Sequence, residues 1–174
     1  ASVGKGGADS VNTEIRTSSA LLLSQDEINS ISEPLLVATE HIDEPNDEFQ
    51  LDVQFAEYSV GEFYTWHTDI WTDDYFDQQT TTILLNEDFE GGEFQIYIGD
   101  ENEEWVREQQ DNLDEDYIET YNLKIGESIN IPAHNQTHRV KPVTQGIRYS
   151  LTIWTYVNTQ LKDILHAHEA SLRS

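Results

Sequence analysis

Alternating apolar and polar residues predict that the chain consists mainly of β-strands. In FQLDVQFAEY, residues 49–58, the two kinds of residue alternate, and β-branched and aromatic side chains are frequent. Side chains of a strand point in turn to its two faces, so this pattern is typical of a strand with one buried face. Similar segments follow at residues 63–71, 80–86, 93–98, 128–132, 137–143 and 146–157.

These predicted strands are short, and turn residues separate several of them, such as Gly61 and the pair Gly91-Gly92. Many short strands at this spacing favour a β-sandwich or jelly roll over a fold in which strands and helices alternate. We therefore predict a mainly β fold with flanking helices.

The remaining segments are predicted to be helical or irregular. Ser24 followed by Glu27 has the pattern of a capping box and predicts the start of a helix, which Pro34 either interrupts or follows with a second turn. At this length the chain, residues 1–174, is predicted to form one domain. Three parts of the chain are predicted to lie outside the strands: a flexible lead-in at 1–13, an acidic insertion with some helix at 100–122, and a helical tail at 158–174.

Composition narrows the classes of function. The chain has no cysteine, which excludes disulfides and thiolate metal sites, and its formal net charge is −25 with only nine basic residues. This charge disfavours a nucleic acid as partner, because phosphate binding depends on clustered Lys and Arg. The acidic surface either serves solubility alone or attracts a basic peptide. No apolar run approaches the ~18 residues of a membrane-spanning helix, and no signal-peptide pattern is present, so we expect a soluble, cytoplasmic protein without a membrane partner.

One histidine and one aspartate stand inside FYTWHTDIW, residues 63–71, a segment otherwise made of aromatic and β-branched residues. His67 and Asp69 are two positions apart, so in a strand both side chains point to the same face and can bind one divalent metal. A third ligand must come from another strand, and His134 and His138 are the candidates. We predict His138, because it lies in a strand-like segment. The alternative is a hydrogen-bonded His-Asp pair with a structural role only.

An arginine stands in the last predicted strand. In RYSLTIW, the side chains of Arg148, Ser150, Thr152 and Trp154 share one face by the same alternation. A buried arginine needs an anionic partner, and its planar guanidinium matches the geometry of a carboxylate. Arg148 therefore either pairs with an acidic side chain of the chain itself or binds a carboxylate ligand.

Four motifs follow one another in a fixed order: HTD at 67–69, GGE at 91–93, HRVKPV at 138–143 and RYS at 148–150. Their order and spacing resemble the Fe(II)/2-oxoglutarate-dependent dioxygenases. Within this superfamily the chain looks most like the prolyl 4-hydroxylase-like branch, including its compact versions in phages and bacteria. The resemblance extends from about Arg16 to Val157.

The resemblance implies a double-stranded β-helix (jelly roll) with a metal at its open end. It implies that His67, Asp69 and His138 bind Fe(II) and that Arg148 binds the distal carboxylate of 2-oxoglutarate. It also implies O2 as cosubstrate and ascorbate as a candidate reductant. The two histidines and one carboxylate are the facial triad of non-haem Fe(II) oxygenases, which leaves coordination positions open.

The resemblance also assigns roles to four further residues. Ser150 and Tyr58 would contact the same distal carboxylate as the arginine, Tyr64 would lie near the substrate, and Trp154 would line the pocket. Strand alternation turns Tyr58 and Tyr64 away from His67 unless a turn or a bulge intervenes.

By resemblance, the chain hydroxylates an unactivated C–H bond, in a prolyl or other peptidyl residue, and releases succinate and CO2. Acidic loops at the mouth would favour a basic or neutral peptide. The alternatives are a hydroxylase of a free amino acid or other small molecule, a catalytically silent jelly-roll binding module, and a cupin-like metal protein with another chemistry.

Overall fold

The computed structural model describes residues 16–30, 49–69, 75–110, 112–133 and 135–158. Within these residues, no helix is both long and apolar enough to cross a bilayer. The elements in chain order are β1 (Ser19–Leu22), α1 (Gln25–Ser30), β2 (Phe49–Tyr58), β3 (Tyr64–His67), β4 (Tyr75–Leu84), β5 (Phe89–Gly91), β6 (Phe94–Tyr97), α3 (Glu103–Glu108), η1 (Glu115–Tyr117), β7 (Ile118–Tyr121), β8 (Ser128–Pro132), β9 (His138–Val140), β10 (Val143–Gly146) and β11 (Arg148–Asn158).

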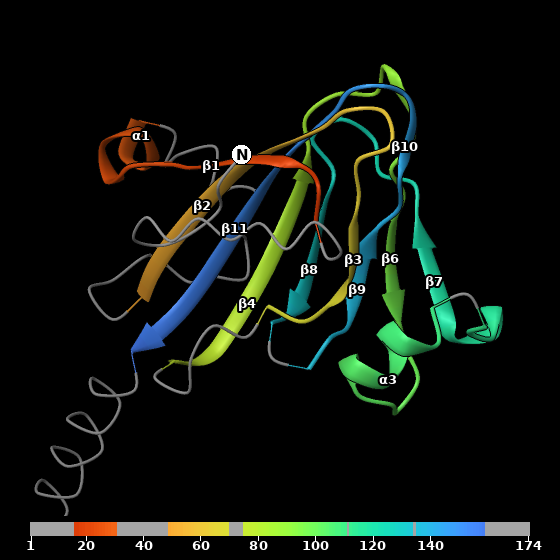
Figure 1. The fold of residues 1–174 in the computed structure, drawn as a ribbon. Helices are drawn as coiled ribbons and strands as arrows, with labels where there is room; N and C mark the ends of the chain where they lie inside the picture. The colour runs from red at the N-terminus through yellow and green to blue at the C-terminus, as the bar shows by residue number, and fades with distance from the viewer. Residues whose placement is uncertain (1–15, 31–48, 70–74, 111, 134, 159–174) are drawn as a thin grey trace, which may run out of the picture.

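The larger sheet has five antiparallel strands in the order β1-β2-β11-β4-β8 (Figure 1). The long strand β11 lies at its centre. Val53 of β2 and Ile153 of β11 are opposite each other in register, and neither is exposed to solvent. Ile83 of β4 and Ile28 of α1 complete this apolar cluster, so α1 packs against the larger sheet.

The smaller sheet has the order β3-β9-β6-β7 and faces the larger one. The main core fills the space between them: Ala56 and Ile131 come from the larger sheet, and Phe94, Ile96 and Val140 come from the smaller. Two antiparallel sheets closed over a shared apolar core are the architecture of a jelly roll. The predicted mainly β fold, a double-stranded β-helix, is therefore confirmed.

The predicted capping box at the start of α1 is confirmed. The backbone N–H of Ser24 donates to Glu27 Oε2 at 2.8 Å, and the N–H of Glu27 donates back to Ser24 Oγ at 3.4 Å. Two donors at the helix start, which have no partner inside the helix, are satisfied in this way. The interpretation of Pro34 falls outside the described residues.

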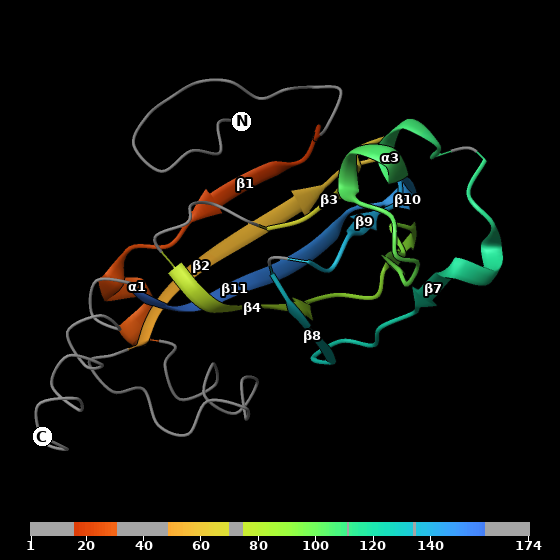
Figure 2. The same cartoon turned by 90° about the horizontal axis from the view of Figure 1, so that it is seen from below.

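The acidic segment 100–122 contains helix, as predicted, but it also contains a strand. Its first part forms α3, which Figure 2 shows beside β3 and β9. Val106 of α3 is fully buried against Trp66 and Tyr97. Its last part forms β7, which pairs with β6, so this end of the segment belongs to the smaller sheet.

Several boundaries differ from the predicted ones. The predicted strand at 63–71 is shorter, because β3 ends at His67, and the end of that prediction lies outside the described residues. The predicted strand at 137–143 divides into β9 and the start of β10 at a proline, Pro142, which lacks the N–H that continued pairing requires.

The lead-in predicted for 1–13 lies outside the described residues. So does the helical tail predicted for 158–174, except for Asn158, which ends β11.

Two features require glycine at both positions of the Gly91-Gly92 pair: the backbone conformation and the closeness of neighbouring atoms. Both residues have a positive φ, 75° and 64°. A Cβ on Gly91 would lie 2.5 Å from the carbonyl oxygen of Pro142, and one on Gly92 would lie 2.8 Å from Cδ of Arg148. Only glycine allows this turn to approach both the β9–β10 connection and the arginine so closely.

We predict that Gly91→Ala destabilises the protein more than Gly126→Ala. Both glycines have a positive φ, 75° and 80°, but a Cβ on Gly126 would meet no atom within 4 Å. The Gly126 variant should lose roughly 1–2 kcal/mol in free energy of unfolding from the strained φ alone. The Gly91 variant should lose at least about 1 kcal/mol more through the clash. Urea unfolding measures both, and equal losses would contradict the steric role of Gly91.

Candidate active site

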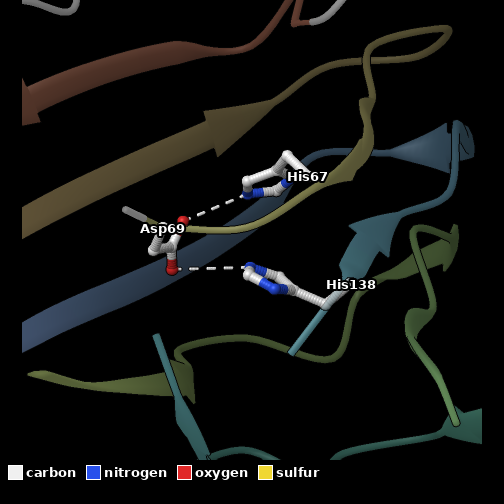
Figure 3. Close-up of side chains that lie close together, drawn as sticks. All are labelled: His67, Asp69 and His138. Carbon is white, nitrogen blue, oxygen red and sulfur yellow. Dashed lines mark ion pairs between the residues drawn. The ribbon is translucent and has the colours of Figure 1, made fainter. Parts of the chain in front are cut away.

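The pairing of β3 with β9 brings two histidines together. His67 ends β3, His138 begins β9, and the two residues are opposite each other in the antiparallel register. Their ring centroids lie 4.2 Å apart. Asp69 follows two residues after His67, beyond the end of β3, and its carboxylate turns toward both rings (Figure 3).

The three side chains form a compact and buried group. The Nε2 atom of His67 lies 3.3 Å from Asp69 Oδ1, and the Nε2 atom of His138 lies 3.5 Å from Asp69 Oδ2. One ligand atom from each residue lies within 4.8 Å of the other two, and all three residues are buried. Across the described parts of the chain, this is the one such group of three residues with metal-binding side chains.

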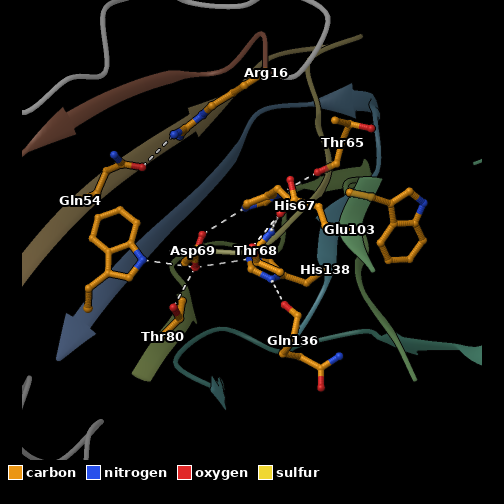
Figure 4. Close-up of polar contacts among 12 residues, drawn as sticks. Arg16, Gln54, Thr65, His67, Thr68, Asp69, Thr80, Glu103, Gln136 and His138 are labelled. Carbon is orange, nitrogen blue, oxygen red and sulfur yellow. Dashed lines mark hydrogen bonds and ion pairs between the residues drawn. The ribbon is translucent and has the colours of Figure 1, made fainter. Parts of the chain in front are cut away.

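Backbone carbonyls fix the orientation of both imidazoles. His67 Nδ1 lies 2.7 Å from the carbonyl oxygen of Thr65, and His138 Nδ1 lies 2.9 Å from that of Gln136 (Figure 4). A carbonyl can only accept, so each Nδ1 carries a proton, and each Nε2, on the side of Asp69, is the ring nitrogen available to a metal. This is the tautomer that metal-binding histidines adopt when the other ring nitrogen donates to an outer partner.

The carboxylate of Asp69 is also held in place. The hydroxyl of Thr80 donates to its Oδ2 atom at 2.7 Å, and Nε1 of Trp154 donates to the same atom at 3.2 Å. The backbone N–H of Asp69 donates to the carbonyl oxygen of Ala133 at 2.9 Å. Partners on β4, on β11 and before β9 therefore fix a residue that lies outside any strand.

The electrostatics favour the metal-binding forms of His138 and Asp69. Burial, and then the neighbouring His67, lower the pKa of His138 to about 4. Burial raises the pKa of Asp69, but His138, His67 and the Thr80 hydroxyl together outweigh it and hold this pKa well below its usual range. At neutral pH His138 is therefore a neutral imidazole and Asp69 a carboxylate, the forms that bind a cation.

Arg148 is buried with part of its hydrogen-bonding capacity unused. The residue is 2% exposed, and its Nη1 donates to Ser150 Oγ at 2.9 Å. Its Nε–H has no partner. Its Cζ lies 5.4 Å from the ring centroid of Tyr58, and burial lowers the pKa of Arg148 while Tyr58 raises it. An arginine stays protonated even so, and no carboxylate of the described residues forms an ion pair with it.

A small cavity joins the arginine to the three ligand residues. Its volume is about 30 Å³, and His67, Asp69, His138 and Arg148 all contribute to its wall. The four residues of β11 predicted to share a face (Arg148, Ser150, Thr152 and Trp154) line it together. That volume holds about two water molecules, so a five-carbon diacid requires the surrounding side chains to move apart.

Arg148 also lines a second, larger pocket. Its volume is about 340 Å³, and its wall includes Gly92, Phe94, Tyr121 and Lys124. None of the three metal-binding side chains lines it. Size alone would favour this pocket, but of the two it is the smaller cavity whose wall combines Arg148 with the three metal-binding side chains.

The structure places the two predicted tyrosines differently. The pairing of β3 with β9 shifts register between Tyr64 and His67, as a bulge does, and the Tyr64 ring stacks on the His67 ring at 3.5 Å. Tyr64 therefore lines the cavity despite its odd offset from the histidine. Tyr58 is opposite Arg148 in register and contacts its guanidinium, but it does not line the cavity.

Further polar residues line the cavity that the pattern of the sequence did not single out. Thr82 and Gln54 belong to its wall, and Thr80, which binds Asp69, lies on the same strand as Thr82. The available signal is the run of threonines at 80–82, because buried hydroxyls require hydrogen-bond partners.

Comparison with known proteins identifies the family. The family model described as 2OG-Fe(II) oxygenase superfamily matches residues 53–156. The chain belongs to this superfamily. A search of curated proteins found no match.

Solved structures of prolyl hydroxylases share the fold of this oxygenase. A prolyl-4-hydroxylase from Pseudomonas putida aligns with a TM-score of 0.58 and 18% identity, over 86% of this chain and 76% of its own. A Trichoplax adhaerens prolyl hydroxylase, bound to a peptide fragment of the hypoxia inducible factor oxygen degradation domain, aligns with a TM-score of 0.60 and 19% identity. The alignment covers 89% of this chain and 69% of that one. The viral collagen prolyl hydroxylase of Paramecium Bursaria Chlorella virus-1, as a 2OG complex, aligns with a TM-score of 0.50 and 19% identity. The alignment covers 84% of this chain and 82% of that one.

We predict that acid destabilises the metal-free oxygenase through His138. Its pKa is about 4 when folded and 6.5 ordinarily. As the pH falls through this interval, the unfolded chain takes up the proton first, so the free energy of unfolding decreases. His138→Gln should lose this part of the pH dependence. Urea titrations across the interval, with a chelator present, measure it, and an unchanged slope in the variant would contradict the assignment.

Proposed function

We propose that this oxygenase is a hydroxylase that uses His67, Asp69 and His138 to bind Fe(II) and Arg148 to bind the distal carboxylate of 2-oxoglutarate. The observation that carries the proposal is the single cavity shared by a metal-binding group and a buried arginine with an unpartnered N–H. A structural His-Asp pair accounts for the first feature but leaves the second unexplained.

The residues fit the groups that the family implies. Two imidazoles and one carboxylate are the ligand set of non-haem Fe(II) oxygenases and leave positions open for a bidentate cosubstrate. The guanidinium suits a carboxylate, since charge-assisted hydrogen bonds to it are among the strongest in proteins. When bound, Fe(II) and 2-oxoglutarate supply O2-dependent oxidation of an unactivated C–H bond, with succinate and CO2 as products.

The chain's own residues orient and shield this chemistry. Thr80 and Trp154 hold the Asp69 carboxylate, and the carbonyls of Thr65 and Gln136 keep both Nε2 lone pairs directed at the metal position. Ser150 holds the guanidinium in the cavity. Phe94 and Val140 contribute apolar side chains to the cavity wall, which helps to keep bulk water away from a reactive centre. Tyr58 contacts the guanidinium of Arg148 but does not line the cavity, so we propose that it supports the arginine and does not itself bind the distal carboxylate.

For the substrate we propose a prolyl or other peptidyl residue in a basic or neutral segment. Support comes from the fold shared with prolyl hydroxylases, one of them bound to a peptide, and from the net charge of −25. Tyr64 supports it further, because its ring lies on His67 at the cavity wall, where an entering residue would meet it.

We predict that the protein releases succinate from 2-oxoglutarate when Fe(II) is supplied and that His138→Ala abolishes this. Loss of an outer partner of a metal ligand costs 10- to 100-fold, so loss of the ligand itself should reduce the rate by more than about 100-fold. Ile125→Ala, at a residue 60% exposed, serves as control and should keep the full rate. Mass spectrometry of succinate measures the rate of its release by the intact protein and by the two variants.

The same assay identifies the substrate class. Basic or neutral proline-containing peptides should stimulate succinate release and gain one oxygen atom. Turnover of a free, negatively charged metabolite with no peptide turned over would contradict the peptidyl proposal. Absence of succinate from the intact protein, even with a broad peptide library, would contradict the hydroxylase proposal itself.

We predict that Arg148→Met weakens use of 2-oxoglutarate while it stabilises the cosubstrate-free protein. Loss of charge-assisted hydrogen bonds should raise the KM for 2-oxoglutarate roughly 10- to 100-fold. Removal of a buried charge without an acidic partner should raise the free energy of unfolding by about 1 kcal/mol or more. Succinate kinetics and urea unfolding measure the two effects.

Arg139→Met is the matched control. Arg139 Nε donates to Gln95 Oε1 at 2.7 Å, and its Cζ lies 4.5 Å from the Trp66 ring centroid. This variant should therefore lose stability and keep its KM. An unchanged KM in the Arg148 variant would show that the arginine does not bind the cosubstrate.

A further inference from the structure

The strand that carries His67 lies at the edge of its sheet. β3 pairs with β9 on one side, and helix α3 lies against it (Figures 1 and 2). An edge strand leaves backbone N–H and C=O groups without strand partners. Side chains of α3 bind one such group, the carbonyl of Trp66 in β3, and also the N–H of Thr68 just after the strand ends, so they bind the residues immediately before and after His67.

Glu103 binds the residue between two of the proposed metal ligands. Its Oε2 atom accepts a hydrogen bond from the backbone N–H of Thr68 at 3.1 Å and another from the Thr68 hydroxyl at 2.7 Å (Figure 4). Thr68 separates His67 from Asp69, so the distance between these two side chains depends on the backbone of Thr68. Glu103 itself is not part of the metal-binding group.

Arg107 extends this contact to the other side of His67. Its Nη2 pairs with Glu103 Oε1, one helical turn away, and its Nε donates to the carbonyl oxygen of Trp66 at 3.1 Å. The two α3 side chains thus link Trp66 to Thr68 across the histidine. The ion pair itself is partly exposed and adds little stability, so the hydrogen bonds to the backbone are the important part.

Contacts that do not involve α3 also hold this segment. Asp69 N–H donates to the carbonyl oxygen of Ala133, and the ring of His67 donates to that of Thr65. Only the side facing α3 depends on a helix, and that helix comes from the acidic segment 100–122. Val106 anchors the helix in the core beneath Trp66, so its position is well defined.

We propose that Glu103, supported by Arg107, is a positioning residue that sets the spacing of His67 and Asp69 for the metal. The inference rests on the proposed function, since it takes these residues as ligands. Without Glu103, Thr68 loses both of these hydrogen bonds, and the 67–69 segment can move away from the metal-binding geometry. Outer partners of metal ligands typically change metal affinity 10- to 100-fold when removed.

Binding of Mn(II) alone to the metal-free protein tests the proposal, with free Mn(II) followed by its paramagnetic resonance signal. Glu103→Ala should raise the Kd roughly 10-fold. Glu103→Gln keeps an oxygen that can accept from Thr68, so its Kd should lie between those of Glu103→Ala and the intact protein. Thr68→Val keeps the charge of Glu103 and loses one hydrogen bond, so its Kd should rise roughly 3-fold.

Glu104→Ala is the control for charge, because it removes an exposed carboxylate from the adjacent position of the same helix. Its Kd should equal that of the intact protein. A Kd for folded Glu103→Ala within two-fold of the intact protein, or an equal rise in Glu104→Ala, would overturn the proposal. If Glu103→Ala does not fold, an unchanged Kd in Thr68→Val overturns it.

The Mn(II) experiment distinguishes a failure of the positioning role of Glu103 from a failure of the proposed function. If the intact protein does not bind Mn(II), the metal site itself is wrong, and the positioning proposal falls with it. If the intact protein binds Mn(II) and Glu103→Ala binds it equally well, only the positioning role is wrong. Thermal unfolding of the metal-free variants separates lost affinity from lost fold, because the proposal requires weaker binding well below the melting temperature.

Discussion

The register between β3 and β9 is the constraint on which the site depends. It sets His67 opposite His138, and the two rings then share the carboxylate of Asp69. A slip of one residue would turn the two histidines to opposite faces of the sheet. The apolar core between the two sheets and the bulge between Tyr64 and His67 constrain this register, and the carbonyls of Thr65 and Gln136 then orient the two rings.

Buried polar groups around the cavity differ in whether their hydrogen bonds are satisfied, and the metal-binding group and Arg148 differ in this respect. The histidines and Asp69 have partners on four strands or their connections, which makes the metal-binding group rigid before any metal arrives. Arg148 instead retains an unpartnered Nε–H in the wall of the same cavity. A protein tolerates a buried cation without a counter-charge when a ligand supplies that charge, at a cost in the stability of the empty state.

The sequence predicted the parts that depend on local pattern. Spacing placed His67 and Asp69 on one side, strand alternation grouped Arg148 with Trp154, and order along the chain indicated the family, which the family model confirms. Alternation failed for Tyr64, because a bulge shifts the register, and it placed Asp69 inside a strand that in fact ends at His67. The partners of Asp69 and Thr68 could not be predicted, since they come from β4 and α3 and meet only in the folded chain.

A crystal structure of the protein with Mn(II) and 2-oxoglutarate tests the central claim most directly. The account predicts one anomalous scattering peak bonded to Nε2 of His67, a carboxylate oxygen of Asp69 and Nε2 of His138. It also predicts the distal carboxylate of 2-oxoglutarate against the guanidinium of Arg148, inside an enlarged form of the small cavity. A peak elsewhere, or 2-oxoglutarate bound away from Arg148, for instance in the larger pocket alone, would contradict it.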